Sequence, residues 1–255
     1  MKAVELAYEH FGDKAKVPLI VLHGFFASSR NWRQIAKKLA EYYCVYVVDM
    51  RNHGNSPHNP EMDYPLMSED LKLFMQQRQI VTANILGHSM GGKVAMWFAL
   101  TYPESVQKLI VVDISPVTYQ HSFDQIINAL KQLPLEQISN RKQADEYLEP
   151  LIPELSYRQF LLQNLQLKQG KYSWRVDLDI FYRTANNIIG FPSVENIAPY
   201  KGEVLFIMGG NSTYTNKEAI KQSFPHAKIS TVDQASHWLH VEKPARFVKE
   251  VVNFL

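Results

Sequence analysis

The sequence predicts an α/β protein in which helices cover both faces of a mostly parallel central sheet. Short runs of apolar and β-branched residues recur along the chain, and segments with helical spacing of apolar residues separate them. Strands buried on both faces need apolar side chains at nearly every position, as parallel strands do. The expected strands are VPLIVLHG (17–24), CVYVVDM (44–50), NILG (84–87), KLIVVDIS (108–115), EVLFIMGG (203–210) and AKISTVD (227–233).

The two ends of the chain and the segments between the strands complete this pattern. Residues 3–18 contain period-two stretches and a Gly12-Asp13 turn signal, which predicts an antiparallel hairpin at the edge of the sheet. The last segment starts with Pro244, which suits a first helical turn, and its apolar residues share one face. Helical spacing predicts helices within 30–43, 65–78 and 244–255.

A long segment between the fourth and fifth of these strands differs from the rest of the chain. From Pro116 to Ser193 the strand pattern stops, and helix signals in Gln-rich and Leu-rich sequence replace it. We interpret residues 116–193 as a helical lid inserted into a core formed by 1–115 and 194–255.

Composition excludes several classes of protein. The 255 residues are 46% hydrophobic, which is enough to bury a full-sized core and argues against disorder. With 27 Lys and Arg against 25 Asp and Glu, the formal net charge is +2, and no basic cluster favours nucleic acid as a partner. The apolar runs are too short for a signal peptide or a membrane span, so we expect a cytoplasmic protein without stable membrane insertion. The sequence gives no indication of the oligomeric state. The single cysteine, Cys44, lies within an apolar run and is expected to be a small buried hydrophobic residue.

The stretch NILGHSMGGKVAMW (84–97) admits two chemical interpretations. Gly87-His-Ser89-Met-Gly91 matches G-x-S-x-G, a strained strand-to-helix turn that exposes a nucleophilic serine. Gly87-x-x-x-x-Gly92-Lys93 nearly forms a phosphate-binding loop, but that loop needs a hydroxyl after the lysine to hold Mg²⁺, and this chain has Val94. An apolar strand before and an apolar helix after favour Ser89 as a nucleophile.

A serine nucleophile needs a base, and SHWLHVEKP (236–244) offers two histidines. His237 follows the last expected strand, in a loop that can return to Ser89. His240 competes, but it follows an apolar Trp-Leu pair and falls at the start of a helical turn. The order nucleophile, acid, base favours His237. An H-x-x-H metal pair is the other interpretation, but no third ligand lies at a telling spacing.

An oxyanion hole needs backbone N–H donors near the nucleophile. Met90, directly after Ser89, supplies one candidate, and Phe25 in the turn LHGFF (22–26) supplies the other. His23 and Gly24 shape that turn and are expected to border the substrate, with His23 more suited to packing than to catalysis.

Five motifs in this order resemble the α/β-hydrolase superfamily from end to end. They are LHGFF (22–26), DMRNHGNS (49–56), LGHSMGGK (86–93), VVDISP (111–116) and SHWLHVEKP (236–244). The variants RNHGNSP and GGNSTY resemble a group of bacterial esterases within it. The resemblance implies the α/β-hydrolase fold with a helical cap, and hydrolysis of carboxylic esters or acyl thioesters without a metal or organic cofactor.

One departure from the superfamily concerns the acid that should orient the histidine. This acid usually follows the strand that here reads EVLFIMGG, but Asn211 and Ser212 occupy the position and cannot ionise. Asp113 is the preferred substitute because it ends a strand at the carboxyl edge of the sheet, where α/β sites are built. The same position serves as the acid in some other hydrolases. Asp179 is the alternative, and Asp113 could instead only cap the following turn through Ser115.

The loop DMRNHGNS also permits two interpretations. Asp49, Arg51, Asn52 and His53 are best explained as residues that tie loops together beneath the site. Arg51 could instead meet an anionic part of a substrate, such as a phosphate of a coenzyme A thioester.

Together these residues predict a serine hydrolase that cleaves esters of small or acyl-chain substrates through an acyl-enzyme. An acyl-CoA thioesterase is the alternative within catalysis, and a catalytically impaired binder of small ligands is the alternative outside it. The partner is a small molecule in each case. Expected pocket residues are the aromatic side chains of Tyr119, Phe181, Tyr182 and Trp238.

Overall fold

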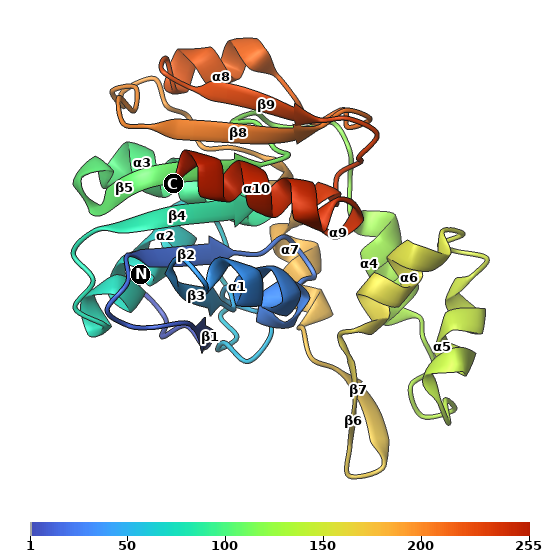
Figure 1. The fold of residues 1–255 in the computed structure, drawn as a ribbon. Coiled ribbons are helices and arrows are strands. Elements are labelled where there is room, and N and C mark those ends of the chain that lie inside the picture. Colours follow the sequence, from blue (N-terminus) through green and yellow to red (C-terminus); the bar gives the residue numbers. More distant parts are fainter. Residues whose placement is uncertain (1) are drawn as a thin grey trace.

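The computed structural model describes residues 2–255 and has a seven-stranded sheet at its centre (Figure 1). The strand order is β1-β3-β2-β4-β5-β8-β9, with β1 antiparallel to β3 and every other neighbouring pair parallel. The predicted α/β-hydrolase fold is therefore confirmed. The strands are β1 (Tyr8–Phe11), β2 (Pro18–Leu22), β3 (Cys44–Val48), β4 (Ala83–His88), β5 (Val106–Val112), β8 (Val204–Gly209) and β9 (Lys228–Val232).

The sheet divides the hydrophobic core into two layers. Along β2, Leu19 and Val21 join one cluster, while Ile20 and Leu22 join the other, because successive side chains of a strand point to opposite faces. Both clusters are buried, which is why the strands read as continuous apolar runs. One face is covered by α1 (Arg33–Leu39), α9 (Leu239–Glu242) and α10 (Pro244–Phe254), and the other by α2 (Tyr64–Gln77), α3 (Met90–Thr101) and α8 (Lys217–Ser223).

The expected N-terminal hairpin is wrong in its pairing. β1 pairs with β3, with Tyr8 opposite Val48, and not with the following strand β2. β2 has parallel partners on both sides, β3 and β4, so neither of its edges is free for β1. The expectation of an antiparallel strand at the sheet edge is correct. The chain that turns at Gly12 does not form a hairpin, however, but passes over β3 to reach β2.

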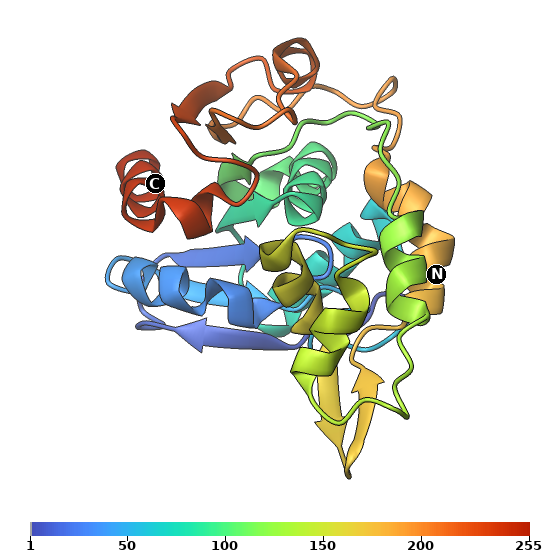
Figure 2. The same cartoon turned by 90° about the vertical axis from the view of Figure 1, so that its right-hand side faces the viewer.

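The segment between β5 and β8 supplies no strand to the central sheet. Figures 1 and 2 show it beyond the carboxyl ends of the parallel strands, over one end of the sheet. Its elements are α4 (Asp124–Lys131), α5 (Arg141–Leu148), α6 (Leu155–Leu162), β6 (Leu165–Lys168), β7 (Lys171–Trp174) and α7 (Leu178–Ile189). We call it the insert. Within residues 2–255, no helix combines the length and the apolar character that crossing a bilayer requires.

The purely helical character expected for the insert is wrong at one place. β6 and β7 form an antiparallel hairpin around Gln169 and Gly170, whose φ angles are 50° and 75°. Positive φ at both loop residues is the requirement of a type I′ turn, which joins strands with the correct twist. In the sequence, the Gln-Gly pair lies between two short stretches of alternating polar and apolar residues, and this pattern could have predicted the hairpin.

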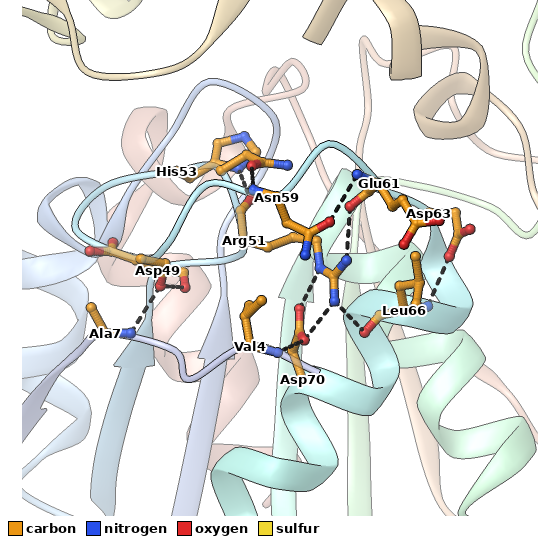
Figure 3. A network of polar contacts seen from close by, with 12 residues as sticks. Val4, Ala7, Asp49, Arg51, His53, Asn59, Glu61, Asp63, Leu66 and Asp70 are labelled. Atoms are coloured by element: carbon orange, nitrogen blue, oxygen red, sulfur yellow. Dashed lines mark hydrogen bonds and ion pairs between the residues drawn. The ribbon is translucent and has the colours of Figure 1, made fainter. Parts of the chain in front are cut away.

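The loop after β3 is held by a buried ion pair (Figure 3). Arg51 donates from Nε and Nη2 to the two carboxylate oxygens of Asp70 at 2.6 and 2.7 Å, and neither side chain is exposed to solvent. A third guanidinium nitrogen donates to the carbonyl of Glu61 at 2.8 Å, and Asp70 also accepts from the N–H of Val4 at 2.7 Å. Arg51 thus has the structural role, and its charge is not available to a substrate.

Replacing Asp70 by asparagine should destabilise the fold strongly, because the Arg51 charge would stay buried without an anionic partner. The expected loss is about 3–5 kcal/mol in the free energy of unfolding, measured by urea denaturation. Glu61→Gln changes an exposed acid in the same region and should stay within about 0.5 kcal/mol. Equal losses in the two variants would contradict the structural role of the ion pair.

Candidate active site

Ser89 occupies a strained turn between β4 and α3. Its φ and ψ angles are 53° and −119°, a conformation that non-glycine residues rarely adopt. The turn is anchored to the next strand, because the Ser89 N–H donates to the carbonyl of Val112 at 3.1 Å. A Cβ atom on Gly87 would collide with the backbone of Gly91, and one on Gly91 with the backbone of Leu22. Both glycines of the motif are therefore required by the close approach of strand and helix.

Lys93, the lysine of the phosphate-loop interpretation, is committed to a different contact. Its buried ammonium donates to the carbonyls of Ile189 and Gly190 at 2.8 and 2.6 Å, at the C-terminal end of α7. Burial lowers the pKa of Lys93 from 10.5 to about 7. Lys93 thus joins the core to the insert.

Asp113 and His237 are brought together from distant parts of the chain. The Nδ1 atom of His237 lies 2.7 Å from Oδ2 of Asp113. Since a carboxylate can only accept, Nδ1 is the donor of this bond, and Nε2 is the ring nitrogen that can act as a base. Asp113 is fully buried and does not bond Ser115, whose hydroxyl instead donates to the carbonyl of Tyr214.

Two further donors hold the Asp113 carboxylate, and sequence reasoning missed both. The N–H of Gly209 donates to Oδ1 at 2.8 Å, and the hydroxyl of Ser212 donates to Oδ2 at 2.6 Å. Ser212 stands at the position where an ionisable acid was sought. A residue that cannot ionise there still serves the site, because it solvates the carboxylate that comes from the neighbouring strand.

His88, next to the nucleophile, ties the histidine loop to the nucleophile turn. Its Nε2 lies 2.9 Å from the carbonyl of His237, so this nitrogen donates. Burial lowers the pKa of His88 well below 6.5, so the ring is neutral and has one donor. Ser89 and His237 line the same cavity, although no hydrogen bond joins their side chains within residues 2–255. The only sequence signal for His88 was its place inside G-x-S-x-G.

The two competing residues have other partners: Asp179 lies outside the cavity, and His240 lies in its wall. Asp179 is exposed and pairs with Lys131 at 2.6 Å, and this hydrogen bond lowers the pKa of its carboxyl group. His240 is buried and stacks on Trp32, with ring centroids 4.4 Å apart and planes 4° from parallel. In the part of the chain that the structure describes, no group of three or more potential metal ligands occurs.

The proposed oxyanion donors flank the nucleophile. Met90 is the first residue of α3, and N–H groups of a first helical turn have no partner within the helix. The turn that contains Phe25 lies against the nucleophile, since a Cβ on Gly24 would be 3.4 Å from Cβ of Ser89. His23 is buried beneath this turn, where its Nδ1 donates to the carbonyl of Gly24 at 2.8 Å.

Comparison with known proteins decides the family. A family model described as the alpha/beta hydrolase fold matches residues 17–244. The chain belongs to the α/β-hydrolase family.

Three similar proteins indicate which members of the α/β-hydrolase family this chain resembles. The Mus musculus protein named sn-1-specific diacylglycerol lipase ABHD11 is 40% identical over 267 residues, which cover 100% of this chain and 86% of its own. The protein named Esterase YbfF from Escherichia coli is 33% identical over 242 residues, 93% of this chain and 92% of its own. A solved structure described as a marine microorganism esterase has a TM-score of 0.95 at 38% identity and covers 99% of this chain and 100% of that one. The expected relationship to bacterial esterases, and to hydrolases of the esterase and lipase type, is confirmed.

A cavity of about 900 Å³ lies between the hydrolase core and the insert. Of the predicted pocket residues, Gly24, Tyr119 and Trp238 line it together with Ser89 and His237. Its walls are largely aromatic and aliphatic, with Phe25, Tyr64, Ile114, Phe123, Ile126, Tyr157, Phe160 and Ile188 among the lining side chains.

The other three residues predicted for the pocket, His23, Phe181 and Tyr182, do not line this cavity. His23 and Phe181 are fully buried behind the lining residues, and the Phe181 ring packs on Phe25 at 4.4 Å between centroids. Tyr182 is 44% exposed and lies beside Lys131 on the outside of the insert. Adjacent residues of a helix point about 100° apart, so Tyr182 turns toward solvent when Phe181 packs inward on the core.

Replacing His240 by phenylalanine should make the protein less sensitive to acid. Burial, with a smaller contribution from the charge of His237, lowers the pKa of His240 from 6.5 to about 3. Between these values the unfolded chain binds more protons, so the stability from His240 is complete above pH 6.5 and falls as the pH falls. The loss at pH 5 is about 2 kcal/mol, and His240→Phe should abolish it while keeping a stacked ring.

Urea denaturation at pH 7.5 and pH 5 measures this effect. His226→Gln removes an exposed histidine and should keep the pH dependence of the parent protein. If His240→Phe lost as much stability between the two pH values as the parent, the burial of a neutral imidazole would not be the cause.

Proposed function

We propose that this α/β-hydrolase cleaves carboxylic esters by nucleophilic attack of Ser89 on the acyl carbonyl. The observation that carries the proposal is the hydrogen bond between Asp113 and His237 in the cavity that Ser89 lines. Nε2 of His237 takes the proton from the Ser89 hydroxyl as the new bond forms. The N–H groups of Phe25 and Met90 hold the oxyanion of the tetrahedral intermediate.

The second half of the reaction uses the same groups. When the intermediate collapses, the proton on His237 passes to the leaving group, and the acyl group stays on Ser89. Water then attacks this acyl-enzyme with His237 as general base, which releases the acid and restores the serine. Asp113 holds the ring in the required tautomer and stabilises the imidazolium by its charge.

The substrate proposed is an ester with an apolar acyl chain. The aromatic and aliphatic walls of the cavity suit a hydrocarbon chain, and its volume is typical of sites for ligands of that kind. The name of the Mus musculus relative, a diacylglycerol lipase, supports an acyl ester of this type. We propose the insert, residues 116–193, as the lid that selects the chain. The impaired-binder alternative loses its main support, the missing carboxylate after β8, because Asp113 supplies one.

Ser89 should be the residue that a fluorophosphonate labels, and Ser89→Ala should abolish both labelling and ester hydrolysis. The expected loss of kcat is at least about 10⁴-fold, because a nucleophile cannot be replaced by its neighbours. Peptide mass mapping locates the label. Ser122→Ala, at another serine of the same cavity, should still be labelled at Ser89. Label on a different serine would contradict the proposed nucleophile.

Asp113→Asn should lower kcat by about 10²–10⁴-fold, because an amide favours the wrong imidazole tautomer and carries no charge. Hydrolysis of p-nitrophenyl butyrate measures the change. Asp179→Asn removes the competing carboxylate at the surface and should keep the kcat of the parent. Full turnover in Asp113→Asn, or a comparable loss in Asp179→Asn, would exclude the proposed acid.

A further inference from the structure

A second, smaller cavity of about 220 Å³ adjoins the first and is built from basic side chains. Arg30 reaches it from the 3₁₀ turn after the Phe25 turn, Arg141 from the start of α5, and Arg175 from the segment after β7. We call this cavity the arginine pocket. Ser28 and the amide side chains of Asn31, Gln163 and Asn164 complete its polar lining, and no carboxylate lines it within the described range 2–255.

This concentration of charge is not a consequence of overall composition. The chain has 27 basic and 25 acidic residues, so a random surface hollow would carry both signs. Burial, followed by the charge of Arg30, lowers the pKa of Arg175, and the charge of Arg141 contributes in the same direction. Asp49 lies near enough to oppose this shift, but its carboxylate is already held by backbone N–H groups of Ser29 and Asn55.

The three guanidinium groups differ in how far they are engaged. Arg141 donates to the carbonyls of Leu162 and Leu165, and Arg175 donates to Oδ1 of Asn55 at 3.0 Å. Arg30 makes no side-chain hydrogen bond or ion pair with any residue from 2 to 255. Its donors are free for a ligand.

The arginine pocket shares part of its wall with the cavity that Ser89 lines. Phe26, Arg30, Asn31 and Gln163 line both cavities. Asn31 donates to Oε1 of Gln163 at 2.7 Å, which bridges the core and the insert at the boundary. The two cavities are therefore neighbours, and a long substrate with its carbonyl at Ser89 would pass this bridge to reach the arginine pocket.

We propose that the arginine pocket binds a phosphate group carried by the alcohol or thiol leaving group of the substrate. This inference rests on the proposed function, because it assumes that an ester or thioester occupies the main cavity. Guanidinium groups match the geometry of phosphate oxygens and form charge-assisted hydrogen bonds with them. Three cations without an acid suit a multiply charged phosphate better than a single carboxylate.

A binding measurement tests the pocket without any turnover. Inorganic pyrophosphate is titrated calorimetrically into the parent protein, Arg30→Gln and Arg183→Gln. Arg183 is exposed on α7, outside both cavities, and its replacement changes the net charge equally. We expect binding to the parent, a Kd raised at least about fivefold in Arg30→Gln, and no change in Arg183→Gln. No binding to the parent, or equal weakening in both variants, would overturn the proposal.

A kinetic measurement identifies the source of the phosphate. One octanoyl chain is presented on glycerol, on glycerol 3-phosphate and on coenzyme A, so that only the leaving group differs. We expect KM to be lower for a phosphate-bearing substrate, and Arg30→Gln to raise that KM at least about fivefold more than the KM for the neutral ester. The glycerol 3-phosphate arm indicates a phospholipid-type ester, and the coenzyme A arm indicates an acyl thioester.

The two proposals fail in different ways. Hydrolysis of the neutral ester through Ser89, with no advantage for either phosphate-bearing substrate, would overturn the arginine pocket alone. If none of the three octanoyl compounds is hydrolysed, the proposed function fails, and the pyrophosphate titration still decides whether the arginine pocket binds phosphate.

Discussion

The site depends on how the protein satisfies one buried carboxylate. Asp113 has no contact with solvent, so its charge must be held by hydrogen bonds from the chain. The donors are the N–H of Gly209, the hydroxyl of Ser212 and the ring of His237, which come from β8 and from two different loops. Meeting this electrostatic requirement brings the end of β5, the end of β8 and the loop of His237 to one point. It also sets the tautomer of the imidazole in the cavity that Ser89 lines.

Neutral histidines stiffen the loops around that point. Burial lowers the pKa of His23, His53 and His88, and each ring donates one N–H to a backbone carbonyl. Their other nitrogens can then accept, as His23 does from Met50 and His53 does from Phe26. A charged imidazole could not accept in this way. The turns that carry Ser89 and Phe25 are thus positioned by neutral imidazoles from neighbouring loops.

The core and the insert contribute different properties to the cavity. Turns and loops at the strand ends of the core carry Ser89 and His237, and the insert supplies a large part of the cavity wall around them. Polar contacts join them at several points. Lys93 reaches the end of α7, Asn31 meets Gln163, and Asn164 and Asn187 donate to the carbonyls of Phe26 and Met62. These contacts hold the insert in a defined position over the strand ends, so the wall of the cavity depends on both parts.

The sequence by itself determined the parallel strands and the nucleophile turn, because burial on both faces and a strained Gly-x-Ser-x-Gly turn leave local patterns. It also indicated Asp113, through the position of a strand end and the resemblance to a family. Only the tertiary structure decided that β1 pairs with β3, that Ser212 serves Asp113, and that Tyr182 faces outward. Pairing partners, hydrogen-bond donors and cavity walls arise where distant segments pack together, and no local pattern of residues encodes that meeting.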